Sequence, residues 1–293
     1  MPVARRLLVM GLGLIGGSVA AGARRSGQFE SVQAWDQQPA AVRRGHALGY
    51  LDTPDWDGDL TADDLVVVAV PTLAAPAVLA GLWDGTTGTL AQGAVVTDVA
   101  SVKGSVMQAL AAHCGGLPAN FVPGHPIAGS ERSGVEAARA DLFADHRVIL
   151  TPAATTAASA IARVEGLWLA LRAHTDQMTP ERHDAVLAMT SHLPHLLAFT
   201  LVDTLGSQPE HEAIFQFAAG GFRDFTRIAS SDPLMWSDIF SANQAAVEQV
   251  LEAFEARLEV VRTLLREQDH EGLRALFSRA KTLRDNHLPG VGE

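Results

Sequence analysis

The glycines near the N-terminus have the spacing of a phosphate-binding turn. A short apolar run, Leu7 to Met10, leads directly into Gly11-x-Gly13-x-x-Gly16, and an Ala-rich segment follows. This order predicts a buried strand, a tight turn and the start of a helix. Gly11 permits the turn, Gly13 lets the backbone approach a pyrophosphate, and Gly16 lets helix and strand pack closely. The phosphates would bind free N–H groups at the helix N-terminus, where the helix dipole favours negative charge.

Asp36 strengthens this interpretation, since Gly-rich turns without a ligand are common. A second strand-like segment, residues 31–35, ends in Asp36, about 20 residues after the last glycine, where dinucleotide-binding folds carry a ribose-binding acid. A carboxylate there repels a 2′-phosphate, and Gln37 and Gln38 follow it, with Arg43 and Arg44 only a turn or two later. We therefore expect NAD rather than NADP. The expected NAD contacts are Gly11, Gly13, Leu14, Ile15, Gly16, Asp36, Val70 and Ser101.

Two later loops carry groups that could act on a substrate. Ligands of such sheets bind beyond the C-terminal ends of the strands, and the loops there contain Ser101, Lys103 and His125. An imidazole beside a nicotinamide is a natural base for a hydroxyl proton, so we expect His125 to be catalytic and to titrate near the reference pKa of about 6.5. Ser101 could hydrogen-bond the imidazole or the nicotinamide amide, or simply cap a helix. Lys103 could be a surface charge.

Strand and helix patterns alternate from the N-terminus to about Met178. The continuous β-branched run 65–70 is typical of a strand buried on both faces. This alternation predicts an α/β fold, a Rossmann-like, doubly wound parallel sheet with right-handed crossovers. Further strands are expected at residues 94–98, 121–122 and 147–150, with 174–178 as one more edge strand. Helices are expected at residues 39–48, 72–82, 101–113 and 159–172.

From Thr179 the pattern becomes almost purely helical. Thr179 and Pro180 form an N-cap and N1-proline signature, and apolar periodicity continues to about residue 205, with Pro194 expected to kink or interrupt the helix. A long helix is expected at about 233–267, followed by a last helix at 270–284. The long helix has a wide apolar stripe. We expect an all-α C-terminal dimerisation domain and hence a homodimer, with an intrachain bundle as the alternative.

The composition indicates a large globular chain. With 293 residues, of which 47% are hydrophobic, it can bury a large core in two domains, which we place at residues 1–178 and 179–293. The net charge of −11 disfavours nucleic acid and anionic membranes as partners, although local cations could still bind an anionic substrate. The single cysteine, Cys114, fits a reducing cytoplasm. The N-terminal apolar run is broken by glycines, unlike a signal peptide, and no apolar stretch looks long enough to cross a bilayer.

Longer motifs occur in order along both predicted domains. They are GLGLIGGS from Gly11, TDVASVK from Thr97, GHPIAGSERSG from Gly124, SHLPH from Ser191 and GGFRDFTRIASSDPLMW from Gly220. Together they resemble the prephenate (cyclohexadienyl, arogenate) dehydrogenase family, over residues 7 to about 284. The glycine motif is shared with many dehydrogenases, whereas the His-Pro and Phe-x-Asp-x-Thr-Arg-Ile-Ala motifs are far more specific. Ser130 stands where relatives often carry Thr, which keeps the hydroxyl.

The resemblance implies a tyrosine-biosynthetic enzyme. Prephenate carries a C4 hydroxyl, a ring carboxylate and a pyruvyl side chain, and its oxidation by NAD with loss of CO2 gives 4-hydroxyphenylpyruvate. By resemblance, His125 accepts the hydroxyl proton, Ser101 orients His125 or the nicotinamide, and Arg227 pairs with a substrate carboxylate through two parallel hydrogen bonds. The other expected substrate-binding residues are His192, His195, Ser130 and His183. Each histidine among them could instead be a surface or capping residue.

Alternatives remain at this point. His192 and His195 have a spacing that suits a metal, but no nearby carboxylate or cysteine completes a site and the oxidation needs no metal, so none is expected. Prephenate and arogenate differ only in a keto or amino group, and the sequence leaves the choice open. A β-hydroxyacid dehydrogenase-like enzyme is more distant, because that group typically uses a lysine on a helix of the second domain, and the helix beginning at Thr179 offers none. The only lysines here are Lys103 and Lys281. A non-catalytic NAD-sensing module is the last alternative.

Overall fold

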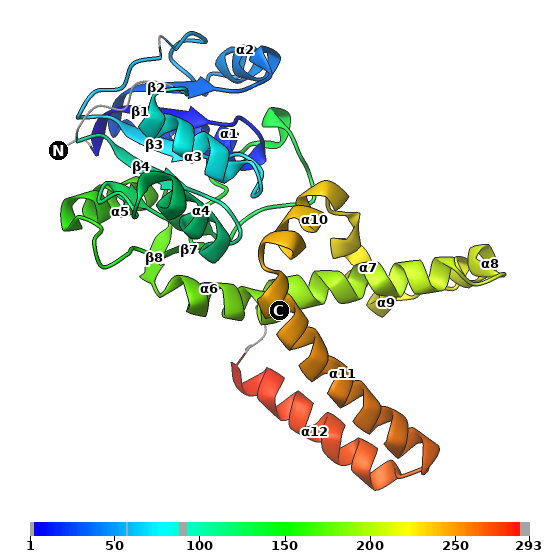
Figure 1. The fold of residues 1–293 in the computed structure, drawn as a ribbon. Helices are drawn as coiled ribbons and strands as arrows, with labels where there is room; N and C mark the ends of the chain where they lie inside the picture. Colours follow the sequence, from blue (N-terminus) through cyan, green and yellow to red (C-terminus); the bar gives the residue numbers. More distant parts are fainter. Residues whose placement is uncertain (1–2, 57, 88–92, 288–293) are drawn as a thin grey trace. The chain divides into compact units, whose positions relative to one another are not determined.

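The computed structural model describes residues 3–56, 58–87 and 93–287. The chain divides into two compact units, Met1–Gln244 and Ala245–Glu293. The first unit contains the α/β part together with the helices that follow it, up to Ala242 (Figure 1). All residues considered below as a candidate site belong to this first unit.

The α/β part is built on a parallel sheet in the order β2-β1-β3-β4-β5. Its strands are β1 (Ala4–Met10), β2 (Phe29–Trp35), β3 (Leu65–Val68), β4 (Val95–Asp98) and β5 (Phe121–Val122). The central strands are apolar on both sides, so alternate residues enter two different cores: Leu7 and Val9 face one, and Leu8 and Met10 the other. This sheet confirms the predicted doubly wound, Rossmann-like fold.

Helices cover both faces of this sheet. Side chains of α1 (Leu14–Ser26) and α5 (Ala158–Ala170) fill the first core, and those of α3 (Ala75–Asp84) and α4 (Gly104–Cys114) fill the second (Figure 1). The short α2 (Pro39–Ala47) adds Val42 to the first core. The sheet therefore directs the C-terminal ends of β1, β2, β3 and β4 to one edge, where the predicted site residues follow them.

A second, smaller sheet corrects the predicted strand arrangement. Within the described residues, β6 (Gly124–Pro126), β7 (Arg147–Leu150) and β8 (His174–Gln177) form a separate sheet, in which β6 and β7 are antiparallel. The expectation that 147–150 extends the main parallel sheet was wrong. His125, expected in a loop, lies within β6 opposite Ile149. Pro123 separates β5 from β6, and because proline has no N–H to donate, the ladder of the main sheet ends there.

The helical segment of the first unit starts as predicted. Thr179 caps α6 (Pro180–Leu187) by accepting a hydrogen bond from Arg182 N at 3.2 Å. The expected interruption near Pro194 is a π-helical turn, Ala188–His192, after which α7 (Leu193–Gly206) continues in the same direction (Figure 1). Proline supplies no N–H to an α-helical ladder, and a wider turn in front of it accommodates that loss. The segment continues through α8 (His211–Gln216), α9 (Gly220–Thr226), a 3-10 turn (Arg227–Ser230) and α10 (Pro233–Ala242).

The single long helix predicted at 233–267 was wrong. Asn243 separates α10 from α11 (Gln244–Arg266), and its side chain donates hydrogen bonds to Asp184 O at 2.9 Å and to His192 Nδ1 at 3.1 Å. Asparagine side chains compete in this way with regular helix. The periodicity of the apolar residues continues across the break, so the pattern alone did not reveal it.

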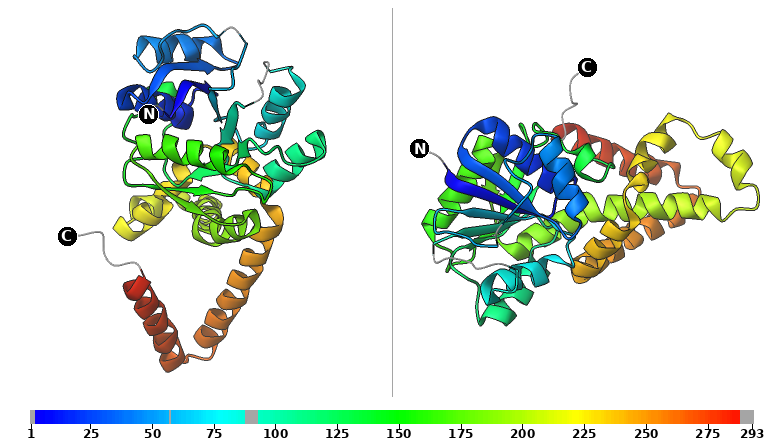
Figure 2. Two further views of the ribbon diagram at one scale, coloured as in Figure 1. Left: turned by 90° about the vertical axis from the view of Figure 1, so that its left-hand side faces the viewer. Right: turned by 90° about the horizontal axis from the view of Figure 1, so that it is seen from above.

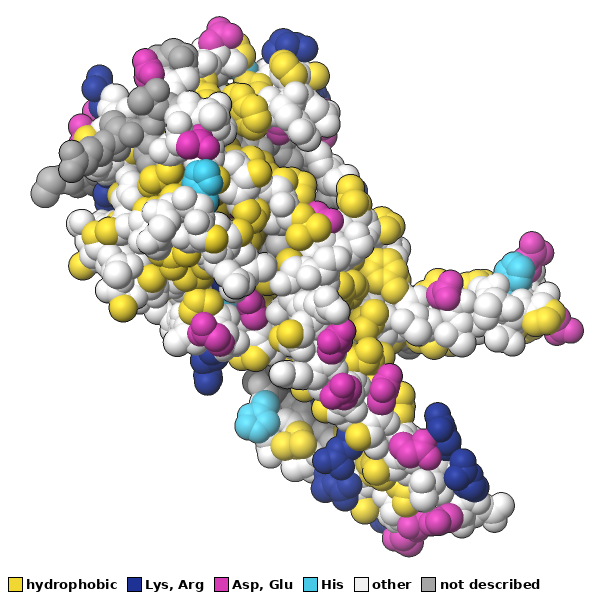
Figure 3. Space-filling view, viewed as in Figure 1, with side chains coloured by type: hydrophobic (Ala, Val, Ile, Leu, Met, Phe, Trp, Pro, Cys, Tyr) yellow, Lys and Arg dark blue, Asp and Glu magenta, His cyan; other side chains and the backbone are white. Residues whose placement is uncertain are grey.

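The second unit consists of α11 and α12 (His270–His287), which diverge from the short turn that joins them (Figure 2, orange to red). Several of its large apolar side chains are exposed among charged ones (Figure 3). They are Leu258, Val260, Leu265, Phe277 and Leu283. Exposed apolar side chains on helices of this kind favour burial against a partner surface.

One helical run changes the expectation that no segment could cross a bilayer. By length and composition alone, Pro180–Gly206 could do so, with a mean hydropathy of 1.5. Core helices of water-soluble proteins pass the same test. Here 28% of the apolar window of this run is buried, and the run contributes His183 and His192 to buried polar contacts with the rest of the first unit.

Candidate active site

The turn between β1 and α1 fits a dinucleotide. Gly11 has φ of 94°, and a Cβ there would lie 2.5 Å from the carbonyl oxygen of Ala69. A Cβ at Gly16 would lie 1.9 Å from the carbonyl oxygen of Gly11, whereas a Cβ at Gly13 would meet nothing within 4 Å. Helix α1, which starts with Leu14 and Ile15, has no acidic residue in its first turn and no side chain capping its N-terminus. Its first N–H groups are therefore available to a phosphate.

Asp36 stands directly after β2, at the edge of the sheet where the glycine turn lies. Its Oδ2 accepts a hydrogen bond from Leu12 N at 2.7 Å, and its Oδ1 accepts one from Gln38 N at 2.8 Å. These bonds fix the carboxylate against the turn, while each oxygen keeps a further lone pair for a ribose hydroxyl. Arg44 is engaged elsewhere, in an ion pair with Glu136 at 3.3 Å. Val70 follows β3 and lies beside Gly11.

His125 is held by a chain of hydrogen bonds from the helical segment. Nδ1 of His125 lies 2.9 Å from Nε2 of His183, and Nδ1 of His183 lies 2.7 Å from Oδ1 of Asp184. His125 is partly exposed, whereas the side chain of His183 is fully buried. His183 was expected to line the substrate site; the structure places it behind His125 instead. The protein thus fixes Nδ1 of His125, the candidate base, by a hydrogen bond.

Asp184 belongs to α6 but also completes another helix. It accepts hydrogen bonds from the backbone N–H groups of Lys103, at 2.9 Å, and Gly104, at 2.8 Å. These are N-terminal groups of α4, for which no local side chain serves as a cap. Burial would raise the pKa of Asp184, but hydrogen bonds from His183 and from these two backbone groups outweigh it, so the pKa is lowered. Asp184 is a carboxylate that sequence reasoning missed.

Burial lowers the pKa of His125 well below its ordinary value, and the neighbouring His183, Lys103 and His192 lower it further. The expectation of a pKa near 6.5 is therefore corrected. The neutral imidazole, which is the form that can accept a proton, dominates at neutral pH.

A buried ion pair lies beneath His125. The Lys103 ammonium contacts Asp98 Oδ2 and donates to Gly124 O at 2.6 Å, and both charged side chains are fully buried. Asp98 Oδ1 accepts from Gly124 N at 3.2 Å. Burial lowers the pKa of Lys103, while Asp98 opposes that shift. The interpretation of Lys103 as a surface charge was wrong, because both groups fix the residue before His125.

Ser101 lies before α4 rather than at its N-cap, which is Lys103. The helix predicted from residue 101 begins at Gly104, so the capping alternative for Ser101 was wrong. Within the described residues its hydroxyl makes no hydrogen bond to His125. Its position between β4 and α4 keeps it at the same edge of the sheet as the glycine turn.

The other two histidines expected at the substrate site, His192 and His195, differ in their surroundings. His192 is buried, accepts a hydrogen bond from Asn243, and has its pKa lowered to about 4 by burial, with His183 and His195 adding to the shift and Asp184 opposing it. His195 is partly exposed, and its ring stacks on Trp236 with centroids 3.7 Å apart. Burial and the charge of Arg227 lower the pKa of His195.

Arg227 and Ser130 lie on the more exposed side of this region. An Arg227 guanidinium nitrogen is 3.5 Å from Glu131 Oε2, and the two side chains are 65% and 45% exposed. Ser130 Oγ accepts a local hydrogen bond from Arg132 N at 3.2 Å. The structure therefore brings a cation and a hydroxyl to the segment that follows His125, with the cation already paired to a carboxylate.

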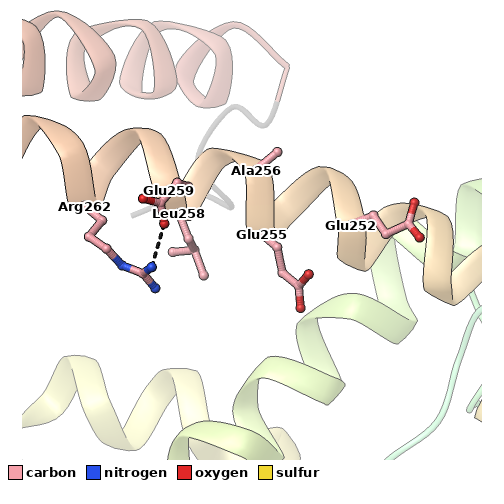
Figure 4. Close-up of a pocket in the computed structure, with 6 residues that line it drawn as sticks. All are labelled: Glu252, Glu255, Ala256, Leu258, Glu259 and Arg262. Carbon is pink, nitrogen blue, oxygen red and sulfur yellow. Dashed lines mark hydrogen bonds and ion pairs between the residues drawn. The ribbon is translucent and has the colours of Figure 1, made fainter.

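A groove beside α11 is unrelated to this site. It is lined by Glu252, Glu255, Ala256, Leu258, Glu259 and Arg262, all from one helix of the second unit (Figure 4). Arg262 is paired with Glu259 at 2.6 Å. Three glutamates beside one engaged arginine would repel an anionic ligand. In the described parts of the chain, no group of three or more His, Cys, Asp and Glu is arranged to hold a metal ion.

Two family models match the chain in succession. The model described as prephenate dehydrogenase, nucleotide-binding domain, matches residues 19–177, and the model described as prephenate dehydrogenase, dimerization domain, matches residues 179–279. Together they cover more than half of the chain.

Individual relatives agree with these matches. The chain is 36% identical to the cyclohexadienyl dehydrogenase of Zymomonas mobilis, over 97% of this chain and 96% of the relative. It is 34% identical to the prephenate dehydrogenase of Bacillus subtilis, over 95% of this chain and 75% of the relative. The structure of prephenate dehydrogenase from Aquifex aeolicus, in complex with hydroxyphenyl propionate and NAD+, is 36% identical, with a TM-score of 0.84 over 96% of this chain and 98% of that one.

Proposed function

The chain belongs to the prephenate dehydrogenase family of NAD-dependent oxidoreductases, and from this premise we propose that it converts prephenate to 4-hydroxyphenylpyruvate and CO2, with His125 as the base. The family acts in tyrosine biosynthesis. The observation that carries the proposal is the imidazole of His125, held through Nδ1 at the edge of the sheet where the glycine turn and Asp36 also lie. Its other nitrogen, Nε2, is left for the substrate.

The residues at the glycine turn fit NAD. Gly11 and Gly16 allow a turn that side chains would block, the open space at Gly13 leaves room for a pyrophosphate, and the N-terminus of α1 presents uncapped N–H groups. Asp36 would hold the ribose hydroxyls, with Leu14, Ile15, Val70 and Ser101 around the dinucleotide. When bound, NAD supplies the acceptor for the hydride of the substrate.

The chemistry of the protein side is proton transfer and positioning. A neutral His125 removes the proton of the C4 hydroxyl, which converts that carbon to a carbonyl as its hydride departs. A carbonyl at C4 then accepts the electron pair that the ring carboxylate releases as CO2, and the ring becomes aromatic. The lowered pKa of His125 keeps the imidazole unprotonated at neutral pH. Ser101 would orient either the nicotinamide or the imidazole.

The substrate is a dianion, and Arg227 is the cation placed to receive one carboxylate. A guanidinium pairs with a carboxylate through two parallel hydrogen bonds. Glu131, which is now 3.5 Å from Arg227, would compete with the substrate for it. Two further residues would add polar contacts to the substrate: Ser130 and His195, which is partly exposed beside Trp236. The buried His192 and His183 would support the site without touching the substrate.

We place the enzyme in the cytoplasm as a homodimer. The exposed, unpaired Cys114 suits a reducing compartment. The family model over residues 179–279 is described as a dimerization domain, and the exposed apolar side chains of α11 and α12 would be buried in such a dimer. The domain boundary at 178/179 remains our proposal.

Arogenate is the alternative substrate, since it carries an amino group where prephenate has a keto group. The carboxylate of Glu131 beside Arg227 favours it, because an ammonium could pair with Glu131 while a carboxylate pairs with Arg227. A cyclohexadienyl dehydrogenase would accept both compounds.

Parallel steady-state assays test the proposal. Purified enzyme is mixed with NAD and either prephenate or arogenate, and NADH absorbance is followed together with CO2 release. We expect turnover of prephenate with one CO2 per NADH, and the ratio of kcat/KM values assigns the preference. Absence of NADH formation with both substrates, or turnover of a β-hydroxyacid instead, would overturn it.

A further inference from the structure

An imidazole can act as a base only through the nitrogen that lacks a proton. Neutral His125 has two tautomers, and the protein contacts Nδ1, which faces His183. The tautomer with the proton on Nδ1 leaves a lone pair on Nε2. The other tautomer leaves Nε2 unable to accept a proton from any substrate.

The hydrogen-bond partners determine where each proton lies. Asp184 accepts from two backbone N–H groups at the N-terminus of α4, a position where the helix dipole stabilises a negative charge. A carboxylate has no proton to donate, so Nδ1 of His183 must carry the proton between them. In neutral His183, Nε2 then carries a lone pair, so it can only accept a hydrogen bond from Nδ1–H of His125.

The opposite assignment has a physical cost. If the proton between the two rings belonged to His183, that ring would carry both protons and hence a positive charge. The side chain of His183 is 0% exposed, and burying a charged group is unfavourable unless it is fully paired. The neutral assignment satisfies every nitrogen of the pair without a second charge.

We propose that Asp184 and His183 fix the tautomer of His125, with the proton on Nδ1 and the lone pair on Nε2, and are positioning residues for the base. This rests on the proposed role of His125. Asp184 also ties the helical segment to α4, so the helix that supports the base is itself fixed to the α/β part.

The tautomer can be measured directly. Long-range 1H–15N spectra of enzyme labelled at its histidines distinguish Nδ1–H from Nε2–H rings, and the His125 signal is assigned by its loss in His125→Asn. At neutral pH without substrate we expect the Nδ1–H tautomer for His125. A predominant Nε2–H tautomer in the wild type would overturn the proposal.

Substitution of Asp184 by asparagine should exchange donor and acceptor in each hydrogen bond that links Asp184, His183 and His125. Oδ1 of Asp184 accepts from both His183 Nδ1 and Lys103 N, and Oδ2 accepts from Gly104 N. In Asp184→Asn with the NH2 group in the place of Oδ1, the amide oxygen keeps the bond from Gly104 N, the bond from Lys103 N is lost, and the NH2 donates to Nδ1 of His183. His183 then donates from Nε2, and His125 is left with its proton on Nε2. We expect that spectral change and a fall in kcat of roughly 10²–10⁴-fold, as found when a histidine base is held in the wrong tautomer. Unchanged kcat in a folded Asp184→Asn enzyme whose spectrum shows the Nε2–H ring at His125 would contradict the proposal.

A second pair of variants keeps the test decisive if Asp184→Asn does not fold. His183→Gln retains an oxygen that can accept from Nδ1 of His125, whereas His183→Leu does not. We expect kcat to stay within about tenfold of the wild type for Gln and to fall much further for Leu, with similar KM in both. Equal losses would indicate a purely structural role. Thr179→Ala, which removes the N-cap of the same helix, controls for loss of α6 stability and should keep both the tautomer and kcat.

The outcomes separate this inference from the proposed function. Wild-type enzyme that oxidises prephenate but shows an Nε2–H ring at His125 would refute the tautomer assignment alone. Wild-type enzyme with the Nδ1–H ring but without turnover of prephenate or arogenate would refute the function alone.

Discussion

Nε2 of His183 lies 2.9 Å from Nδ1 of His125, across 58 residues of sequence. This contact joins α6 to β6, so the helical segment that begins near residue 180 directly supports the candidate base of the α/β part. Asp184, the next residue, adds a second connection by capping α4. The geometry of the base therefore depends on both parts of the first unit.

The choice of cofactor should depend on Asp36. Its carboxylate is fixed by Leu12 N and Gln38 N and cannot easily move away from a 2′-phosphate. We expect kcat/KM to favour NAD over NADP by at least about tenfold, or 1.4 kcal/mol. Asp36→Ser should weaken NAD binding and narrow that ratio, because the repulsion is removed. Equal or higher kcat/KM with NADP in the wild type would show that Asp36 was misinterpreted.

Two glycines of the turn should respond differently to alanine. Gly16→Ala would place a Cβ 1.9 Å from the Gly11 carbonyl oxygen, so we expect a lower melting temperature. Gly13 has φ of −83° and open space at its Cβ position, so Gly13→Ala should fold normally but bind NAD more weakly. Thermal unfolding and NAD titration measure both effects. A Gly13→Ala protein with wild-type NAD affinity would argue against a pyrophosphate at that position.

Arg227 should control substrate binding rather than cofactor binding. Arg227→Ala removes a charge-assisted pair, which typically costs about 2–5 kcal/mol, and the exposure of this side chain favours the lower end. We expect KM for prephenate to rise and the Kd for NAD to stay unchanged. Glu131→Gln is the matched variant, and it should lower KM for prephenate because the competing carboxylate is neutralised. Loss of NAD binding in Arg227→Ala would instead place Arg227 in the cofactor site.

His192 should make stability depend on pH. Its pKa is lowered to about 4 by burial, against about 6.5 in the unfolded chain. The folded state thus favours neutral His192, and the stabilisation is fully present above pH 6.5 and is lost as pH falls toward 4. Urea unfolding should therefore show a steeper loss of free energy of unfolding over this range for wild type than for His192→Gln. Parallel pH dependence in the two proteins would contradict the assignment.

Local patterns were sufficient for much of the fold, including the glycine turn and the position of Asp36. The strands of the main sheet, the glycine turn and Asp36 each depend on residues close together in sequence, and they occur where predicted. Lys103 was misjudged because nothing local distinguishes a lysine paired in the core with Asp98 from one at the surface. Asp184 and Asn243 gave no signal, since the α4 groups that Asp184 caps lie at least 80 residues away and the partners of Asn243 at least 51. The break at Asn243 depends on those same distant contacts.

The pH dependence of kcat in wild type and in His125→Asn tests the central claim most directly. For wild type with prephenate and NAD, we expect kcat to rise with pH through one ionisation below 6.5. Burial, with the neighbouring His183, Lys103 and His192 adding to it, lowers the pKa of His125, and only the neutral ring is active. In His125→Asn, kcat should fall by roughly 10²–10⁴-fold, with little change in KM and loss of that ionisation. Near-normal turnover in His125→Asn, with the pH profile of the wild type, would contradict the account.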